Sequence, residues 1–412
     1  MLRRVKNNIL PIVFILVIMI GLFGTAITQG KQIAWNVVKN NEEYRSEDTV
    51  NGKLRSYISA FEGSVNDGVF LKERYIDLFG ILQNAMNKDV IPSNGYTGTI
   101  VRGSDSKLYT ASSITTESEG EYSLEDITEY SNALIQLNSI VKDSGAELLY
   151  VQAPQKYHEG VTVPIPIDAQ RLLARKDAFL EQIDGKVNYI DMTQSIYDNG
   201  IDYDSLFFAT DHHWTVDAAF WCYQEICEYL NTNTDYHIEN TYYDSDNWNK
   251  YVLKNAYLGS SGVRVGSHYV GRDDFSLITP KFDTDFERHY MSNYMVDYNG
   301  EFTQCILTDY EKFLYEDYQG LIWGIYTGSD SPYVSIDNRL IDNDKKVLIV
   351  KDSFGLPVSA FMCTTCKNMV IYDLRYAHDK SLTHYIQDEG FDLVVIVYNP
   401  ESLSSKMFNF TE

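Results

Sequence analysis

Short apolar runs alternate with helically spaced apolar positions along much of the chain. Five runs predict buried strands: 148–151, 187–190, 346–350, 369–372 and 393–397. Apolar positions three or four residues apart predict helices over 134–141, 172–180, 216–230 and 357–362. Helices that alternate with short buried strands are typical of a parallel sheet covered on both faces. The pattern therefore predicts an α/β fold.

The pattern breaks over 235–340, where Tyr, Asp, Asn and Gly are frequent. We predict an irregular insertion there. Two of its aromatic residues, Trp248 and Trp323, are candidates for stacking on sugar rings, although burial in the core is the alternative.

A long uncharged segment lies close to the start of the chain. Residues 1–8 carry three positive charges, and the 19 residues 9–27 carry none. A helix of that length spans about 28 Å, close to the thickness of a bilayer core. The positive-inside rule then leaves 1–8 in the cytoplasm and the rest outside. We predict a single-pass signal-anchor in the cell membrane, and a cleaved signal peptide with secretion is the alternative.

This prediction divides the chain into four parts. Residues 1–8 form a cytoplasmic tail, 9–27 a transmembrane signal-anchor and 28–95 a juxtamembrane helical segment. The α/β domain follows over 96–412 and contains the insertion.

Composition removes several classes of function. The chain has 412 residues, and 34 Lys and Arg against 58 Asp and Glu give a net charge of −24. That charge argues against nucleic acid as a partner, because phosphate binding needs clustered cations. A hydrophobic content of 44% supports a large core and excludes disorder over most of the chain. Five cysteines are too few for a disulfide scaffold, and Cys363 and Cys366 suggest a local disulfide or packing.

The first candidate for chemistry is Ser353. It follows the predicted strand 346–350, and Gly355 and Pro357 then open a helix. Ligands of open α/β sheets bind at the carboxyl ends of the strands, and a helix N-terminus stabilises an oxyanion there. The alternative is that Ser353 only caps the helix.

The second candidate is the segment Asp211-His212-His213-Trp214, immediately before the predicted helix 216–230. Asp211 and His213 lie two residues apart, so the carboxylate can orient the imidazole for a serine. Structural histidines and a metal site remain alternatives. Consecutive histidines in an extended segment point to opposite faces, which disfavours a shared metal. We expect no resident metal or other cofactor.

These residues carry a family resemblance. Asp352-Ser353-Phe354-Gly355 resembles the Gly-Asp-Ser block of SGNH (GDSL-type) hydrolases, with Lys351 in place of the glycine. Residues 211–214 resemble the Asp-x-His-Trp signature of circularly permuted SGNH proteins in bacterial polysaccharide O-acetylation, of the alginate type. The literal Asp-His-His-Trp, with 259–266 and 271–275, is similar to the DHHW protein family. In the permuted branch the acid and base precede the serine, as here.

The resemblance implies a fold and a set of roles. The fold is an SGNH-hydrolase-like three-layer sandwich with a central parallel sheet. Ser353 is the implied nucleophile, His213 its general base and Asp211 the orienting acid, whereas His212 falls on a variable position. The candidates for oxyanion or substrate binding are Gly355, Arg375, Asn399 and Gln152; a surface salt bridge is the alternative for Arg375.

The implied function is an extracytoplasmic O-acetyltransferase that modifies a cell-envelope or exported polysaccharide through an acetyl-serine. A carbohydrate acetylesterase with the same triad is one alternative, and a non-catalytic glycan-binding or scaffold subunit is another. Because acetyl-CoA is cytoplasmic, the resemblance implies an integral-membrane O-acyltransferase (MBOAT) as the partner that delivers the acetyl group.

Overall fold

The computed structural model forms two compact units, Met1–Leu82 and Gln83–Glu412. The description covers residues 2–43, 58, 61–63, 65, 69–92, 98–111, 125–165, 169–290, 297–308, 323–328, 330–377 and 381–411.

The first unit is helical. Helix α1 runs over Leu2–Glu43, and α3, over Lys72–Ala85, ends just beyond this unit. Within the unit, the backbone N–H of Phe70 donates to the Thr25 hydroxyl at 2.9 Å. In the part of the chain that the structure describes, no helix combines the length and the apolar character that crossing a bilayer requires. The predicted transmembrane helix over 9–27 is therefore not confirmed.

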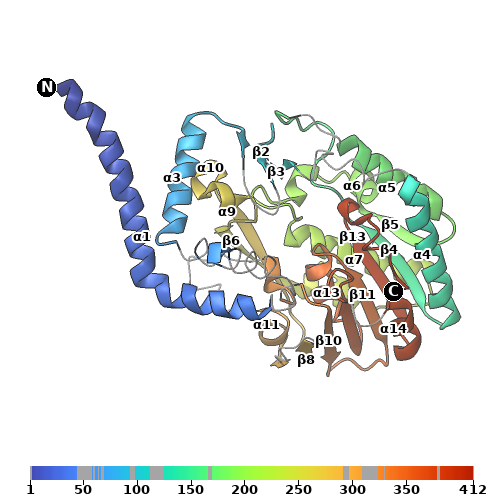
Figure 1. The fold of residues 1–412 in the computed structure, drawn as a ribbon. Helices are drawn as coiled ribbons and strands as arrows, with labels where there is room; N and C mark the ends of the chain where they lie inside the picture. The colour runs from blue at the N-terminus through green and yellow to red at the C-terminus, as the bar shows by residue number, and fades with distance from the viewer. Residues whose placement is uncertain are drawn as a thin grey trace, which may run out of the picture. The chain divides into compact units, whose positions relative to one another are not determined.

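An eight-stranded sheet organises the second unit (Figure 1), in the order β5-β4-β13-β11-β12-β10-β8-β9. The first five strands are parallel and are the five predicted from the sequence. Their bounds are β5 Asn188–Asp191, β4 Glu147–Gln152, β13 Leu393–Tyr398, β11 Lys346–Lys351 and β12 Asn368–Tyr372. The predicted α/β fold is confirmed in this half of the sheet.

The other half corrects the prediction of a purely parallel sheet. Strands β10 (Tyr333–Asn338), β8 (Phe286–Tyr290) and β9 (Asp297–Gly300) extend it in antiparallel fashion, so the sheet is mixed. All three belong to the segment predicted to be irregular. Strands β6 (Trp248–Tyr257) and β7 (Asp273–Pro280) of that segment form a separate antiparallel pair. The sequences of these antiparallel strands mix polar and apolar residues and do not resemble the apolar runs of the central strands.

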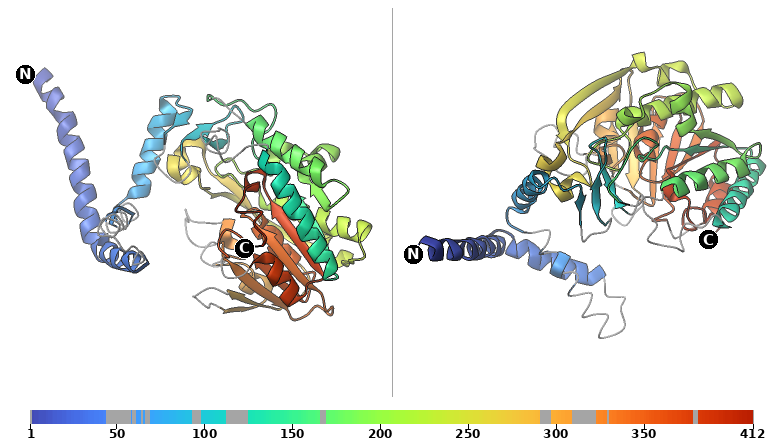
Figure 2. Two further views of the ribbon diagram at one scale, coloured as in Figure 1. Left: turned by 45° about the vertical axis from the view of Figure 1, so that its right-hand side comes forward. Right: turned by 90° about the horizontal axis from the view of Figure 1, so that it is seen from above.

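Helices cover both faces of the sheet, as Figure 2 shows from two sides. Helices α4 (Glu125–Asp143), α5 (Ala169–Ile183) and α14 (Leu382–Glu389) supply one hydrophobic cluster. Helices α7 (Val216–Asn233) and α13 (Gly355–Met362) supply the other. Along β11, Leu348 and Val350 belong to the first cluster and Val347 and Ile349 to the second. This alternation is the period-two geometry of a strand buried on both faces.

Short elements complete the unit. They are β1 Val90–Ile91, β2 Ile100–Arg102, β3 Leu108–Thr110, α6 Met192–Asp198, α8 Asn240–Tyr243, α9 Gly262–Val265, α10 Ser267–Val270, α11 Phe302–Cys305 and the 3-10 turns η2 Tyr203–Leu206, η3 Ser245–Asn247, η4 Trp323–Ile325 and η5 Pro400–Ser402. The cysteines are all buried and unpaired, so Cys363 and Cys366 pack in the core and form no disulfide.

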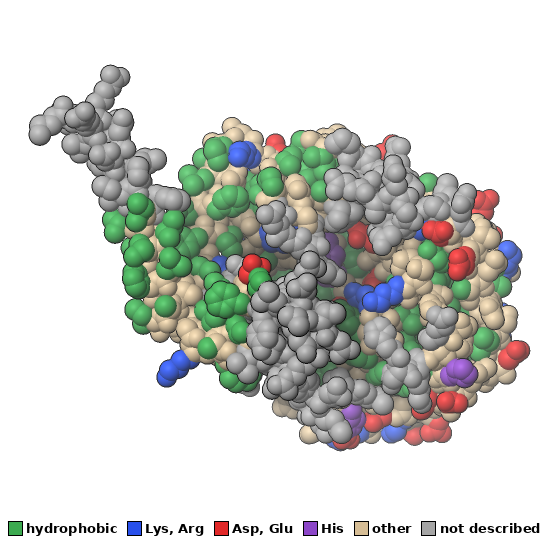
Figure 3. Space-filling model, viewed as in Figure 1, with side chains coloured by type: hydrophobic (Ala, Val, Ile, Leu, Met, Phe, Trp, Pro, Cys, Tyr) green, Lys and Arg blue, Asp and Glu red, His purple; other side chains and the backbone are tan. Residues whose placement is uncertain are grey.

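Acidic and basic side chains are interspersed among the described residues on the face seen in Figure 3. No continuous basic stripe is visible among them there, in keeping with the net charge of −24.

Strand β11 ends on a buried lysine. The Lys351 side chain is 1% exposed, and its Nζ lies 2.5 Å from Asp330 Oδ1 and 2.8 Å from Asp373 Oδ2. Asp373 is fully buried and also binds Arg375. Its neighbours Arg375 and Lys351 overcome the effect of burial and lower the pKa of Asp373. The lysine that stands in place of a family glycine is thus a paired internal charge.

We expect Lys351→Met to lower the free energy of unfolding by about 3–5 kcal/mol, because it leaves buried carboxylates without one cation. Lys346→Met is the matched control on the same strand, since Lys346 pairs with the half-exposed Glu389. The control is expected to cost about 0–1 kcal/mol. Urea unfolding of both variants measures the difference, and equal losses would contradict a structural role for the Lys351 cluster.

Candidate active site

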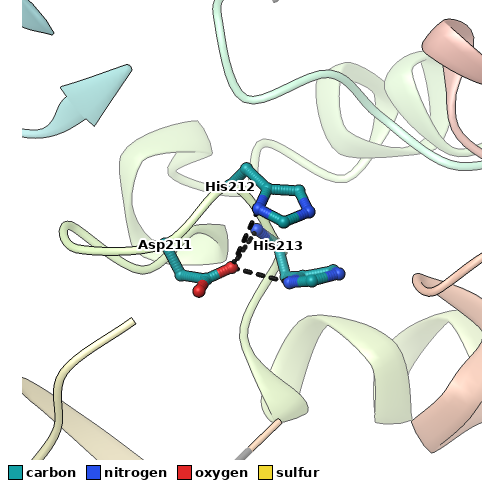
Figure 4. A group of neighbouring side chains, drawn as sticks. All are labelled: Asp211, His212 and His213. Atoms are coloured by element: carbon teal, nitrogen blue, oxygen red, sulfur yellow. Dashed lines mark hydrogen bonds and ion pairs between the residues drawn. The ribbon is translucent and has the colours of Figure 1, made fainter. Parts of the chain in front are cut away.

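Three residues predicted from the sequence come together at the carboxyl edge of the sheet. Ser353 follows β11 on the turn before α13, and Asp211 and His213 lie on a bend before α7. His213 Nε2 is 2.7 Å from Ser353 Oγ, and His213 Nδ1 is 2.6 Å from Asp211 Oδ1. Figure 4 shows the carboxylate facing the near edge of the ring. The three side chains form one hydrogen-bonded chain from carboxylate to hydroxyl.

Backbone and side-chain contacts hold the carboxyl end of the bend that carries His213. Phe207 and Trp214 form an isolated antiparallel bridge across it. The Trp214 indole N–H donates to the carbonyl of Phe354 at 3.2 Å, which joins the histidine segment to the serine turn. The Thr215 hydroxyl accepts from the N–H of Ala218 and caps α7. Contacts on the carboxyl side of His213 therefore hold the imidazole next to the serine turn.

Asp211 is buried, and each of its carboxylate oxygens is satisfied. The His213 backbone N–H donates to Oδ1 at 2.9 Å. The Tyr257 hydroxyl at 2.8 Å and the Ser260 N–H at 2.6 Å donate to Oδ2. Burial by itself raises the pKa of this carboxyl, but the two histidines and these donors hold it well below its usual range. Asp211 is therefore ionised at neutral pH, where it can orient the His213 ring.

The two glycine-containing blocks of the sequence wrap around this carboxylate. A Cβ at Gly259 would lie 2.3 Å from the Asp211 Cβ, so only glycine lets this loop approach. Asp273 accepts from the N–H of Ala209 at 2.6 Å and from the Thr210 hydroxyl at 2.5 Å. The Thr210 hydroxyl in turn accepts from the Gly259 N–H at 2.8 Å. Residues far apart in sequence thus fix the backbone on which Asp211 sits.

The serine turn has its own support. Asp352 accepts from the Phe354 N–H at 2.8 Å, the Asn399 N–H at 2.7 Å and the Ser402 hydroxyl at 2.7 Å. Burial raises the pKa of Asp352, although these donors oppose the shift. The carboxylate joins the end of β11 to the segment after β13, and so holds Ser353 at the sheet edge.

Trp323 contacts two members of the triad. Its indole N–H donates to the Ser353 carbonyl at 2.9 Å. Its ring stacks on the His213 imidazole with centroids 4.6 Å apart and planes 15° apart. It is buried, so it packs against the catalytic candidates and is not an exposed platform for sugars. Trp248 is buried as well.

The four predicted binding residues have different surroundings. The Gly355 N–H already donates to the Asp352 carbonyl at 3.1 Å. A Cβ at Gly355 would lie 2.6 Å from the Lys351 Cβ, so packing requires this glycine. Among the described residues the Ser353 N–H has no acceptor, which leaves it as the available backbone donor at the serine.

Gln152 does not line a cleft. It is fully buried, and its Nε2 donates to the Tyr398 carbonyl at 2.8 Å between β4 and β13. Arg375 binds Asp373 through Nε at 2.9 Å and Nη2 at 2.7 Å, and reaches Asp330 at 2.9 Å. The Arg375 side chain is 28% exposed and forms salt bridges in this structure, as the alternative prediction had it. Asn399 lies beside His212, and its side-chain Oδ1 caps η5 by accepting from the Glu401 N–H at 2.7 Å.

Asp211, His212 and His213 each place a possible metal-ligand atom within 4.8 Å of the others. Both ring nitrogens of His213 are already engaged, one by Asp211 and one by Ser353. A metal would have to break this hydrogen-bonded chain, so the donor set fits a triad better than a cation site. The histidine rings nevertheless lie side by side, with centroids 3.8 Å apart and planes tilted by 38°, which corrects the expectation that they point to opposite faces.

Sequence reasoning missed several supporting residues. Tyr257, Ser260 and Trp323 lie in the segment predicted to be irregular, and no local pattern ties them to Asp211 or Ser353. Lys156 is buried and donates to the carbonyls of Leu108 and Asp211, each at 2.7 Å. Burial lowers the pKa of Lys156 to about 7. Its position shortly after a strand was the only sequence signal.

Comparison with known proteins agrees with this architecture. Residues 100–248 match the family described as the SGNH hydrolase-like domain of acetyltransferase AlgX. The structure of Bacillus cereus PatB1 with a sulfonyl adduct superposes with a TM-score of 0.60 at 21% identity, covering 78% of this chain and 100% of that one. A DHHW family protein from Eubacterium siraeum gives a TM-score of 0.55 at 15% identity, covering 78% and 98%. The predicted resemblance is confirmed, and the chain carries an SGNH-like α/β domain.

No curated protein matches the sequence significantly. At identities this low the superpositions establish the fold alone.

The opposite pKa shifts of Asp211 and Asp352 predict opposite pH dependences of stability. The lowered pKa of Asp211 stabilises the fold above the unfolded value of about 3.9, and this contribution is lost as the pH falls below it. The raised pKa of Asp352 means that its ionisation destabilises the fold as the pH rises through that region.

We therefore expect the stability lost in Asp211→Asn to be largest near neutral pH and to shrink below about pH 4. For Asp352→Asn we expect the free energy of unfolding of the wild type to fall relative to that of the variant as the pH rises above about 4. Urea unfolding of the three proteins between pH 3 and 7 measures both trends. Parallel pH profiles for the two variants would contradict the assigned shifts.

Proposed function

We propose that the α/β domain is an O-acetyltransferase that modifies a cell-envelope or exported polysaccharide through an acetyl-Ser353 intermediate. The observation that carries this proposal is the unbroken hydrogen-bonded chain from Asp211 through His213 to a half-buried Ser353. A serine hydroxyl becomes a useful nucleophile only when such a base is aligned with it. The match of residues 100–248 to an acetyltransferase family supports the choice of an acetyl group.

In the first step Ser353 Oγ attacks the carbonyl carbon of an acetyl ester or thioester. His213 Nε2 takes the serine proton, and ionised Asp211 stabilises the imidazolium through Nδ1. The Ser353 N–H, at the start of α13, is the backbone donor for the oxyanion. The leaving group then departs with the proton from His213.

In the second step a sugar or polyol hydroxyl attacks the acetyl-serine. Its proton passes to His213 Nε2 and the new ester bond forms. The bond from the acetyl carbon to Ser353 Oγ then breaks, and His213 returns the proton to Oγ. Water can take the place of the sugar, which would make the protein an acetylesterase with the same triad. Transfer requires a site that holds the acceptor and excludes water.

We expect Ser353→Ala to abolish acetylation, because it removes the oxygen that carries the acetyl group. We expect His213→Ala to slow acetylation by at least about 10³-fold through loss of the base. The measurement is the mass of the intact protein after incubation with 4-nitrophenyl acetate, with release of 4-nitrophenol followed in parallel. Far-UV circular dichroism of each variant controls for folding.

Full activity in Ser353→Ala would exclude the serine mechanism. Loss of activity on treatment with EDTA, together with one bound zinc per chain, would favour the metal alternative. A wild-type protein that neither accepts an acetyl group nor hydrolyses the ester would favour a scaffold role. Methanesulfonyl fluoride, which reacts with activated serines, gives an independent label for Ser353 in wild type and its loss in Ser353→Ala.

The reaction is proposed to take place outside the cytoplasm, at the cell membrane. Three positive charges in 1–8 followed by the uncharged segment 9–27 support this location. Acetyl-CoA does not reach that side, so the proposed partner is an integral-membrane O-acyltransferase (MBOAT) that carries the acetyl group across.

Protease added to intact cells tests this location. We expect it to degrade the α/β domain while a cytoplasmic marker protein stays intact, because only exported chains are accessible. The control is the same treatment after cell lysis, in which both proteins are cleaved. Protection of the domain until lysis would place it in the cytoplasm and remove the need for a membrane partner.

A further inference from the structure

A second imidazole, that of His212, lies beside the candidate base His213. His212 Nδ1 is 3.3 Å from Asp211 Oδ1, the oxygen that also binds His213 Nδ1. The two ring centroids are 3.8 Å apart, and the ring planes are tilted by 38°. Figure 4 shows both rings with one nitrogen toward the carboxylate and the other on the far side. The Nε2 atoms of both histidines are therefore presented in the same direction.

The neighbouring Asp211 carboxylate favours a hydrogen on His212 Nδ1. Asp211 is ionised and only accepts, so His212 Nδ1 carries the hydrogen that faces Oδ1 and the Ser260 hydroxyl, which is 3.2 Å away. Nε2 is then a lone-pair acceptor. The protein surroundings and the adjacent His213 lower the pKa of His212 to about 4, so the ring stays neutral at pH 7.

The His212 side chain is partly open to solvent. It is 42% exposed, and among the described residues nothing donates to its Nε2. His212, Phe354, Asn399, Tyr109 and Tyr157 line a shallow depression that is open to solvent. Aromatic walls with a few polar groups are typical of pockets that hold a ring-shaped ligand.

We propose that His212 is a specificity-determining residue that accepts a hydrogen bond from a second hydroxyl of the acceptor, beside the hydroxyl that attacks acetyl-Ser353. The substrate class is therefore a diol on adjacent carbons, as in a pyranose ring or a polyol. This inference rests on the proposed function. His213 Nε2 takes the proton of the attacking hydroxyl, and His212 Nε2 holds its neighbour without exchanging a proton.

The proposal explains how the site selects a sugar over water. Water has no neighbouring hydroxyl, so it gains nothing from His212. An acceptor diol gains one hydrogen bond, which corresponds to about a fivefold to tenfold preference. Loss of His212 should lower transfer and leave formation of the acetyl-enzyme almost unchanged.

The test uses 4-nitrophenyl acetate as donor and two acceptors of equal size, trans-cyclohexane-1,2-diol and cyclohexanol. The wild type is expected to transfer acetyl to the diol about fivefold to tenfold faster per hydroxyl group. In His212→Phe, which keeps a ring and removes the acceptor nitrogen, this preference should fall to about one, and hydrolysis should gain at the expense of transfer. His212→Gln, whose amide oxygen accepts, should recover part of the preference. His237→Phe is the matched control at an exposed histidine.

The outcomes separate this proposal from the proposed function. Acetyl-Ser353 that forms normally in His212→Phe with an unchanged diol preference would overturn the role of His212 alone. A wild type with no diol preference would do the same. Failure of the wild type to form acetyl-Ser353 would overturn the function and the inference together. If His212→Phe does not fold, the wild-type acceptor comparison and His212→Gln still decide the question.

Discussion

The arrangement of the site depends on keeping one buried carboxylate ionised. An isolated carboxylate in a protein interior is very costly, so Asp211 persists as a charge only because its two oxygens receive hydrogen bonds from the His213 backbone and ring, the Tyr257 hydroxyl and the Ser260 N–H. Two of these donors come from the β6–β7 region, remote in sequence. Residues that are absent from any triad motif thus decide whether His213 is correctly oriented.

The α/β scaffold contributes the other half of the geometry. Parallel strands end at one edge, and β11 delivers Ser353 there while Asp352 anchors the turn to the segment after β13. Trp214 and Trp323 then bridge the serine turn to the histidine segment through the carbonyls of Phe354 and Ser353. The hydroxyl and the imidazole belong to different parts of the chain, so these indole contacts maintain the 2.7 Å separation.

Local patterns were sufficient for the five parallel strands and for the three residues that meet at their edge. Strands buried on both faces are continuous apolar runs, which are easy to recognise in a sequence. The Asp-x-His spacing keeps the carboxylate of Asp211 within hydrogen-bond distance of His213. The antiparallel strands β8, β9 and β10 were missed because polar residues interrupt their apolar positions. Gln152 was misplaced because a polar residue at a strand end looks the same whether it lines a cleft or, as here, bridges β4 and β13 inside the core.

The adjacent rings of His212 and His213 show why extended-chain reasoning failed at one step. Alternation of side chains holds for a strand, but residues 211–213 form a bend. The bend brings Asp211 back toward both rings, and its Oδ1 attracts Nδ1 of each. A single carboxylate oxygen therefore favours the same tautomer in both imidazoles, the one in which Nε2 is the acceptor. One of the two Nε2 atoms is occupied by Ser353, so the other is left to interact with whatever occupies the adjoining depression.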